Sequence, residues 1–263
     1  FFFKQKTAYE IRNCDWSSDV CSSDLETGEA TVRVRARELL RALEVRRLLR
    51  RLVRLDLDRA GSKKPEALLT GAVFSAQMVR TFTKAAPELS RLLRNEARYL
   101  RPLMKGRSLP MRARLLSDHL TSVIGLKGAK SGALDLDHVL IDRVLESKLG
   151  VPVALSLIWL IVARWSGLSV CGVAMPDHFL IRVHGRRPVL IDPFHSGRQV
   201  TKVDCIRYLK RLGHRQLLSH MRDLSDREML MHYLRAVRRA AAARGRDDAQ
   251  ESLRDAIFQL EVR

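Results

Sequence analysis

The most regular pattern of apolar and polar positions lies at residues 150–200. Nearly every position from 153 to 165 is apolar, which predicts a helix that is buried on all sides. Pro152 fits the first turn of this helix, because a missing backbone N–H removes no hydrogen bond there. Short apolar segments follow the helix and predict three strands, at residues 169–174, 178–184 and 189–192. The segment therefore predicts one buried helix followed by short strands.

Two polar side chains stand at the ends of these strands. His178 begins the second strand, on the face opposite Phe179 and Ile181, and Asp192 ends the third strand. A plain two-residue turn at 186–187 would place Asp192 opposite Ile181, on the wrong face for a contact with His178. A bulge near Pro188, which cannot donate to the strand ladder, would place both side chains on one face. Their orientation decides whether they can act together.

Helical patterns lie on both sides of this segment. Leucines at three- and four-residue spacing, separated by arginines, predict an amphipathic helix at 31–58. Ser225 followed by Glu228 forms a capping-box pattern at the start of another helix. The expected helices are 31–58, 66–84, 87–100, 110–123, a short one that ends near Gly150, 203–213, 215–221, 225–244, and one from Asp247 or Asp248 to about Leu260. The last two would form a helical hairpin.

Other candidate sites have simpler explanations. The glycine-rich loop at 125–132 lacks the residue order of a phosphate-binding loop. Asp118 and His119 resemble a metal or acid–base pair, but such a histidine is typical of a surface or a satisfied core. Helix capping and an exposed helix face account for a group of four carboxylates, which are Asp135, Asp137, Asp142 and Glu146.

The composition predicts a folded and strongly basic protein. The chain of 263 residues is 46% hydrophobic and has a formal net charge of +19, which is distributed along the sequence. Dispersed arginine is typical of solvated helix faces, and association of basic helices with nucleic acid remains an alternative. No apolar segment reaches the length of a membrane span, and no secretory signal is recognisable. The cysteines, Cys14, Cys21, Cys171 and Cys205, lack ligand spacing. We therefore expect a cytoplasmic protein without a metal, cofactor or membrane partner.

The first 25 residues differ from everything that follows. They read FFFKQKTAYEIRNCDWSSDVCSSDL, show neither a helical nor a strand period, and resemble translated sequencing-adapter sequence. We exclude this stretch, residues 1–25, from the expected fold as non-native. The remaining pattern predicts N-terminal helices at 26–84, a core at 85–222 and the helical hairpin at 223–263.

The core contains an ordered set of segments that resembles a known family. The segments are VLESKLGVPVALSLIWLIVARWSGL, PDHFLIRV and DPFHSGR. In this order they resemble the bacterial SirB family, in which a transglutaminase-like domain is usually followed by tetratricopeptide repeats. The resemblance implies an α+β fold with a transglutaminase-like (papain-like) core. A buried helix would pack against a small antiparallel sheet, with N-terminal helices before it and the hairpin as a first repeat after it.

The same resemblance implies which residues would form an active site. An active transglutaminase-like enzyme needs a cysteine in the first turn of the buried helix, a histidine on the neighbouring strand and an aspartate that orients the histidine. His178 matches the histidine and Asp192 the aspartate, whereas the cysteine position is occupied by Pro152. Proline cannot act as a nucleophile. The resemblance thus implies a non-catalytic, regulatory or scaffold protein, a pseudoenzyme that binds a protein partner.

A catalytic alternative uses a different nucleophile. Ser156 lies one turn further along the buried helix and could face the same cleft, which would give a hydrolase or acyl-transfer enzyme with His178 and Asp192. We favour the simpler interpretation, in which Ser156 donates a hydrogen bond to the carbonyl four residues earlier. Cys171 lies in the middle of a strand and is expected to be a small buried side chain.

Overall fold

The computed structural model describes residues 28–57, 65–81, 83–129, 135–214 and 219–262. The adapter-like residues 1–25 and the end of the glycine-rich loop lie outside the described residues. The chain divides into two compact units, residues 1–44 and residues 45–263. The first unit is described from Gly28 onward, as the beginning of helix α2 (Gly28–Val53). The candidate site lies in the second unit.

The second unit combines helices with a small sheet. Its elements after α2 are, in chain order, α3 (Glu66–Val79), α4 (Ala86–Met104), α5 (Leu109–Asp118), the π-helical turn η2 (His119–Val123), β1 (Lys127–Gly128), the 3₁₀ turn η3 (Leu136–His138), α6 (Ile141–Ser147), β2 (Leu149–Gly150), α7 (Pro152–Trp165), β3 (Val170–Met175), β4 (His178–Val183), β5 (Val189–Asp192), β6 (Arg198–Val200), α8 (Lys202–Arg211), the 3₁₀ turn η4 (Ser219–Met221), α9 (Asp226–Ala243) and α10 (Asp247–Val262). Both helical and strand elements are present, as the expected α+β class requires.

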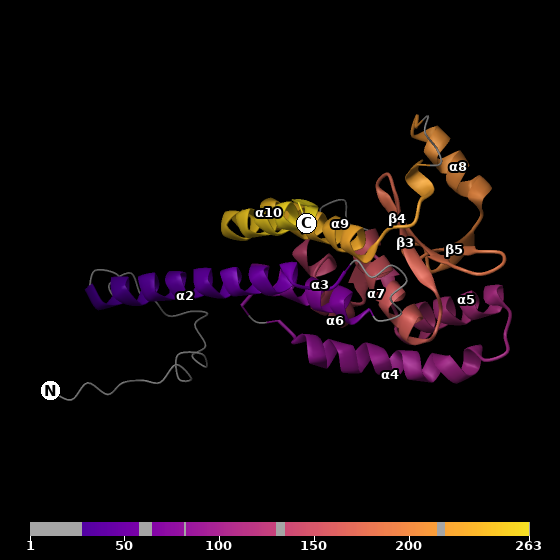
Figure 1. Ribbon diagram of the computed structural model, residues 1–263, viewed down its shortest axis with the longest axis horizontal. Helices are drawn as coiled ribbons and strands as arrows, with labels where there is room; N and C mark the ends of the chain where they lie inside the picture. Colours follow the sequence, from indigo (N-terminus) through magenta and orange to yellow (C-terminus); the bar gives the residue numbers. More distant parts are fainter. Residues whose placement is uncertain (1–27, 58–64, 82, 130–134, 215–218, 263) are drawn as a thin grey trace. The chain divides into compact units, whose positions relative to one another are not determined.

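Helix α7 is the central element of this unit. It contacts strands β3 and β4 and helices α3, α4, α6 and α9 (Figure 1). All side chains from Val153 to Ala163 are buried, which confirms the prediction of a helix that is apolar on every side. Pro152 begins the helix after the extended residue Val151.

Strands β3, β4, β5 and β6 form one antiparallel sheet in that order. Alternate side chains enter two different clusters, as expected for a sheet that is covered on both faces. Ile181, Val183 and Ile191 join the main core around α7. Leu180 and Leu190 pack on the other face, against Leu209 and other residues of α8. The sheet therefore lies between α7 and α8.

The turn between β4 and β5 is longer than a plain two-residue turn. Val183 pairs with Val189 and Ile181 pairs with Ile191, so residues 184–188 form the connection. The pairing that a two-residue turn at 186–187 would give is therefore wrong by one position. The longer connection turns Asp192 to the face that carries Leu180 and His178, because side chains two residues apart share a face. His178 and Asp192 therefore lie on the same face of the sheet, and not on opposite faces as a two-residue turn would place them.

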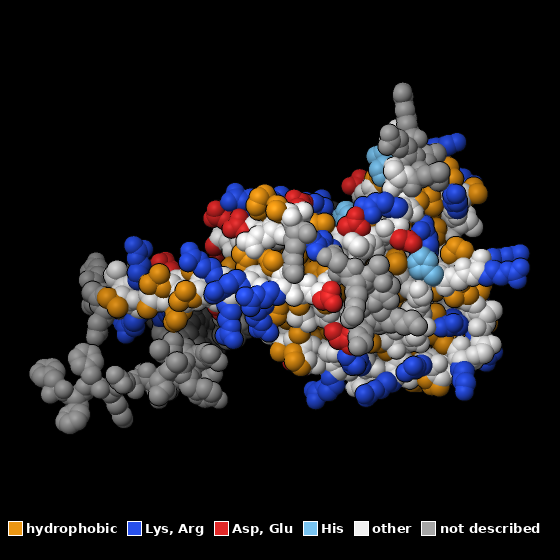
Figure 2. Space-filling model, in the orientation of Figure 1, with side chains coloured by type: hydrophobic (Ala, Val, Ile, Leu, Met, Phe, Trp, Pro, Cys, Tyr) orange, Lys and Arg blue, Asp and Glu red, His pale blue; other side chains and the backbone are white. Residues whose placement is uncertain are grey.

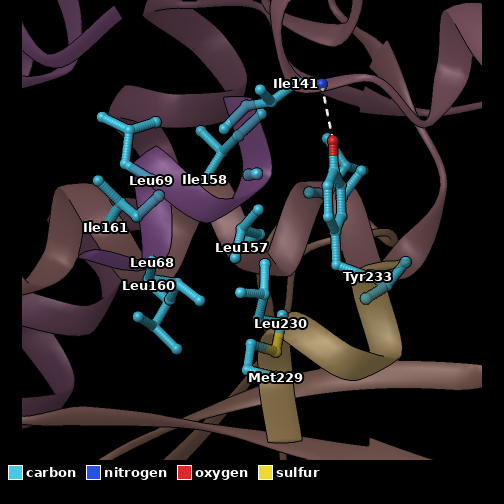
Figure 3. Packing of buried hydrophobic residues seen from close by; sticks show 14 of the residues in the cluster. Leu68, Leu69, Ile141, Leu157, Ile158, Leu160, Ile161, Met229, Leu230 and Tyr233 are labelled. Atoms are coloured by element: carbon cyan, nitrogen blue, oxygen red, sulfur yellow. Dashed lines mark hydrogen bonds between the residues drawn. The ribbon is translucent and has the colours of Figure 1, made fainter. Parts of the chain in front are cut away.

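The main core joins helices that are distant in sequence. Leucines and isoleucines of α3 and α7 pack against Leu230 and Met229 of α9 (Figure 3). The buried hydroxyl of Tyr233 accepts a hydrogen bond from the backbone N–H of Ile141 at 3.0 Å (Figure 3). Burying the apolar side chains removes their surface from water, which is the main stabilising contribution to this fold.

Helices α9 and α10 form the expected hairpin and belong to the same compact unit as the sheet. The Ser225–Glu228 capping box is confirmed, because the Ser225 hydroxyl accepts from the Glu228 N–H and the Glu228 carboxylate accepts from the Ser225 N–H. Arg164 at the end of α7 forms a bidentate ion pair with Asp226 at the start of α9, with N–O distances of 2.6 and 2.7 Å. This pair fixes the hairpin to the central helix.

Several element boundaries differ from the predicted ones. Helix α3 ends at Val79 rather than near residue 84, and the helix expected at 110–123 changes to a π-helical turn after Asp118. Of the helix expected at 215–221, the described part is the single turn η4. None of the described helices combines the length and hydropathy that crossing a membrane would require.

Candidate functional site

A cleft of about 750 Å³ lies between the first turn of α7, the sheet and helix α8. Its lining combines apolar side chains with histidines, arginines and aspartates. The lining includes Pro152, His178, Asp192, Phe194, His195 and Arg198. A concave surface with a few convergent polar groups is the usual setting of a ligand-binding site.

His178 and Asp192 meet in this cleft. The Nε2 atom of His178 lies 2.9 Å from Oδ1 of Asp192, and both side chains are largely buried. Strand β4 begins at His178 and strand β5 ends at Asp192, so the sheet fixes both backbones. Among the described residues Nε2 is the only atom of the His178 ring with a hydrogen-bond partner. The structure therefore brings together the two residues that the sequence singled out.

A second histidine shares the same carboxylate. Nδ1 of His195 lies 2.8 Å from Oδ2 of Asp192, and the backbone N–H of His195 donates to Oδ1 at 3.1 Å. The turn after β5 makes this possible, because Ser196 and Gly197 adopt left-handed conformations with φ of 56° and 66°. Sequence analysis missed His195. The signal that could have indicated it is its position three residues after Asp192, in a segment with glycine shortly afterwards.

The histidines determine the ionisation of Asp192. Burial alone would raise the pKa of this carboxyl, but the hydrogen bond and charge of His178 and the hydrogen bonds of His195 outweigh burial and lower the pKa to about 2. Arg198 adds a further positive charge, with its Nε 3.4 Å from Oδ2. Asp192 is therefore an anion at neutral pH, and each histidine nitrogen that faces it donates a hydrogen bond.

Pro152 lines the same cleft, at the first turn of α7. The helix N-terminus favours negative charge there, as it would for a thiolate, but a proline side chain offers no nucleophilic atom. Cys205 of α8 also lines the cleft. Its side chain belongs to the apolar cluster under α8, and burial raises the pKa of its thiol, so little thiolate forms at neutral pH.

Ser156 is not part of the cleft surface. It is fully buried within α7, and the residues that line the cleft do not include it. The expected hydrogen bond from its hydroxyl to the carbonyl four residues earlier is wrong, since Ser156 Oγ has no partner among the described residues. Cys171 is half-buried rather than buried, and burial raises the pKa of its thiol.

The remaining candidate residues from the sequence lie outside this cleft, and each makes contacts of its own. His119 is buried and its Nε2 lies 2.9 Å from the carboxylate of Glu96, but it is only partly satisfied, because its Nδ1 has no hydrogen-bond partner among the described residues. Asp135 caps the turn η3 by accepting from the N–H of Asp137. Asp142 corrects the prediction of an exposed acidic face, because it is buried, faces Arg80 at 3.8 Å and has a pKa that burial raises.

Two groups of three side chains have ligand atoms close enough to hold a metal ion. In each group the atoms lie within 4.8 Å of one another, as far as the described residues are concerned. One group is His178, Asp192 and His195, and the other is Cys171, His184 and Asp223. The first group opens on the cleft.

Comparisons with known proteins agree with this architecture. The family model described as "Transglutaminase-like superfamily" matches residues 76–235, which is more than half of the chain. A "UPF0162 protein" of Xylella fastidiosa (strain 9a5c) is 28% identical over 177 residues, 64% of this chain and 63% of that protein. A "UPF0162 protein" of Vibrio cholerae is 30% identical over 74 residues, 27% of each chain. Mouse "F-box only protein 21" is 31% identical over 88 residues, 30% of this chain and 14% of that protein.

The matched part is less than two thirds of the length of each of these relatives. No solved structure matches the chain. The family model nevertheless covers the central helix, the whole four-stranded sheet and both members of the His178–Asp192 pair. On this match the chain belongs to the transglutaminase-like superfamily.

Proposed function

We propose that this protein is a non-catalytic member of the transglutaminase-like superfamily that binds a segment of a protein partner in its cleft, in a regulatory or scaffold role. The observation that carries the proposal is Pro152. It lines the cleft beside His178 and Asp192, at the helix position where the resemblance requires a cysteine. An acid–base pair without a nucleophile can hold a ligand by hydrogen bonds but cannot form a covalent intermediate.

The cleft also offers features that suit an extended peptide. Strand β6 is the last strand in the order of the described sheet, and Gln199 and Val200 of this strand line the cleft. An added strand could bind the free backbone groups of such an edge. Phe194 and Tyr208 provide apolar surface, and Arg198 provides positive charge for an acidic side chain.

A first experiment tests the absence of catalysis. The wild-type protein is incubated with serine- and cysteine-directed electrophiles and with activated esters, beside His178→Ala and the matched control His184→Ala. We expect no labelling or turnover that depends on His178. Turnover that His178→Ala abolishes and His184→Ala preserves would replace the proposal with a hydrolase or acyl-transfer function. Loss of that turnover in Ser156→Ala would identify Ser156 as its nucleophile.

A second experiment tests binding in the cleft. A photo-crosslinking amino acid replaces Gln199 in the cleft or, as a control, the exposed Arg254 of α10. In lysate of the native host, the Gln199 position should join one discrete protein and the Arg254 position should not. The crosslink should decrease when Phe194→Ala is added. Equal crosslinking from both positions would contradict binding in the cleft.

Association with nucleic acid remains the competing proposal, because the net charge is +19. On the face in Figure 2, however, Lys and Arg side chains lie in several separate groups, among acidic and apolar ones. Several arginines are already paired, such as Arg164 with Asp226 and Arg244 with Asp135. Binding to nucleic acid that falls steeply with salt would favour this alternative.

A further inference from the structure

The carboxylate of Asp192 lies between two imidazole rings. His178 Nε2 is 2.9 Å from one of its oxygens and His195 Nδ1 is 2.8 Å from the other. The ring centroids of the two histidines are 5.3 Å apart. Two imidazoles and one carboxylate are a donor set that suits zinc and similar divalent transition metals. We propose that His178, Asp192 and His195 form a binding site for such an ion in the cleft, whether or not the cleft also binds a protein partner.

The geometry of the group supports this assignment. One candidate ligand atom from each residue lies within 4.8 Å of the other two. An ion at about 2.0–2.2 Å from each of three donors needs donors that are roughly 3–3.5 Å apart. His178 Nε2 lies 2.9 Å from Oδ1 of Asp192 and His195 Nδ1 lies 2.8 Å from Oδ2, so a shared ion needs small rotations of the carboxylate and the rings to bring one donor of each residue into that range. The ion would replace the two protons that now lie between the histidines and the carboxylate.

The central ligand is held in place by the backbone. Asp192 is the last residue of β5, its carboxylate accepts the N–H of His195, and its carbonyl accepts the N–H of Gly197 at 2.8 Å. These bonds close a tight turn that returns His195 to the carboxylate. A site that is already arranged loses little conformational entropy when the ion binds.

The group also has an open side. His195 keeps 53% of its side-chain surface exposed and lines the cleft with His178 and Asp192. Two neutral imidazoles and one carboxylate would leave a divalent ion with one positive charge, so water or an anionic side chain could complete its coordination from the cleft. Arg198, which opposes a cation near Asp192, has a side chain that is 63% exposed and can turn into solvent.

The second group of potential ligands is less suited to a metal ion. The carboxylate of Asp223 already forms an ion pair with Arg182, which also donates to the carbonyl of Met221 at 2.6 Å. A fixed guanidinium at a ligand opposes a cation. Burial raises the pKa of Cys171, which disfavours the thiolate that a metal requires. His184 of this group therefore supplies a matched control.

The test is titration of the full chain with Zn²⁺ by calorimetry and with Co²⁺ by visible absorption. We expect the wild-type protein to bind one ion at this site, with a cobalt spectrum typical of nitrogen and oxygen ligands. His178→Ala and His195→Ala should each weaken this binding by more than about 10-fold, the smallest loss usual even for an outer-shell partner. His184→Ala should bind as the wild-type protein does. The exposed His195 makes His195→Ala the variant least prone to unfold, and circular dichroism checks each fold.

Three results would overturn the proposal. The wild-type protein could bind neither Zn²⁺ nor Co²⁺. It could bind them with an affinity that folded His178→Ala and His195→Ala variants retain. It could also lose the ion in His184→Ala, with a sulfur-to-cobalt charge-transfer band in the wild-type spectrum, which would assign the ion to the Cys171 group.

Discussion

Replacing Asp192 by asparagine should remove a pH-dependent part of the protein's stability. Hydrogen bonds and charge from His178, together with hydrogen bonds from His195, hold the pKa of Asp192 at about 2 against the opposing effect of burial. In an unfolded chain the carboxyl would return to its ordinary value of 3.8. Because the folded pKa lies below the unfolded one, Asp192 stabilises the fold fully above about pH 4 and loses this effect as the pH falls toward about 2.

The size of this contribution follows from the two values. A difference between 3.8 and about 2 corresponds to about 2 kcal/mol, at 1.36 kcal/mol for each pH unit. The free energy of unfolding of the wild-type protein should therefore fall by about 2 kcal/mol more than that of Asp192→Asn between about pH 5 and pH 2. Urea denaturation followed by circular dichroism at several pH values measures the free energy of unfolding of both proteins against pH. Subtracting one curve from the other removes the contribution of the other carboxyl groups.

The control for this measurement is Asp118→Asn, which removes a carboxyl whose side chain is 64% exposed. Its curve should run parallel to that of the wild-type protein across the same pH range. If the curve of Asp192→Asn also ran parallel to that of the wild-type protein across this pH range, the histidines would not stabilise the Asp192 anion.

Three further substitutions test the packing around the site. Arg164→Ala should destabilise the fold by about 3–5 kcal/mol in urea denaturation, because it leaves the largely buried carboxylate of Asp226 unpaired. Arg254→Ala, in the exposed pair with Glu251, should cost less than about 1 kcal/mol, and equal costs would contradict this reasoning. Gly197→Ala should lower the free energy of unfolding by about 3 kcal/mol or more, since the φ of Gly197 is 66° and a Cβ would overlap Trp159. Gly213→Ala, at a φ of 78° with open space around it, should lower it by only about 1–2 kcal/mol, and a smaller loss at Gly197 than at Gly213 would refute close packing against Trp159. Ser156→Ala should stabilise the fold by about 1 kcal/mol and so raise the melting temperature, because it removes a buried hydroxyl without a partner. A lower melting temperature would indicate that the hydroxyl is satisfied.

Apolar patterns were sufficient to predict the central part of the fold. The continuous apolar run after Pro152 could only be a buried helix, and the alternation around Phe179 and Ile181 predicted a strand with two different faces. Both features depend on local sequence. The SirB name, the comparison with a tetratricopeptide repeat and the non-native origin of residues 1–25 stay predictions.

Tertiary contacts explain what the sequence could not provide. Whether Asp192 faces His178 depends on the length of one turn, and a change of one residue there reverses the face. His195 was missed because its role arises from the turn at Ser196 and Gly197, which no periodic pattern marks. The sequence is equally compatible with a Ser156 hydroxyl that donates a hydrogen bond to a backbone carbonyl of the preceding helical turn. Asp142 is buried beside Arg80, which lies far away in sequence.

The shared carboxylate explains why one group of residues supports two different proposals. Since Asp192 is ionised, His178 donates from Nε2 and His195 donates from Nδ1. In the neutral form of each ring, the other nitrogen carries a lone pair. A catalytic dyad would use the lone pair on Nδ1 of His178 to take a proton from a nucleophile, and Pro152 offers none. The hydrogen-bonded nitrogens can instead exchange their protons for a metal ion. A fixed carboxylate and two imidazoles without a nucleophile beside them therefore support the proposed role in binding rather than in covalent catalysis.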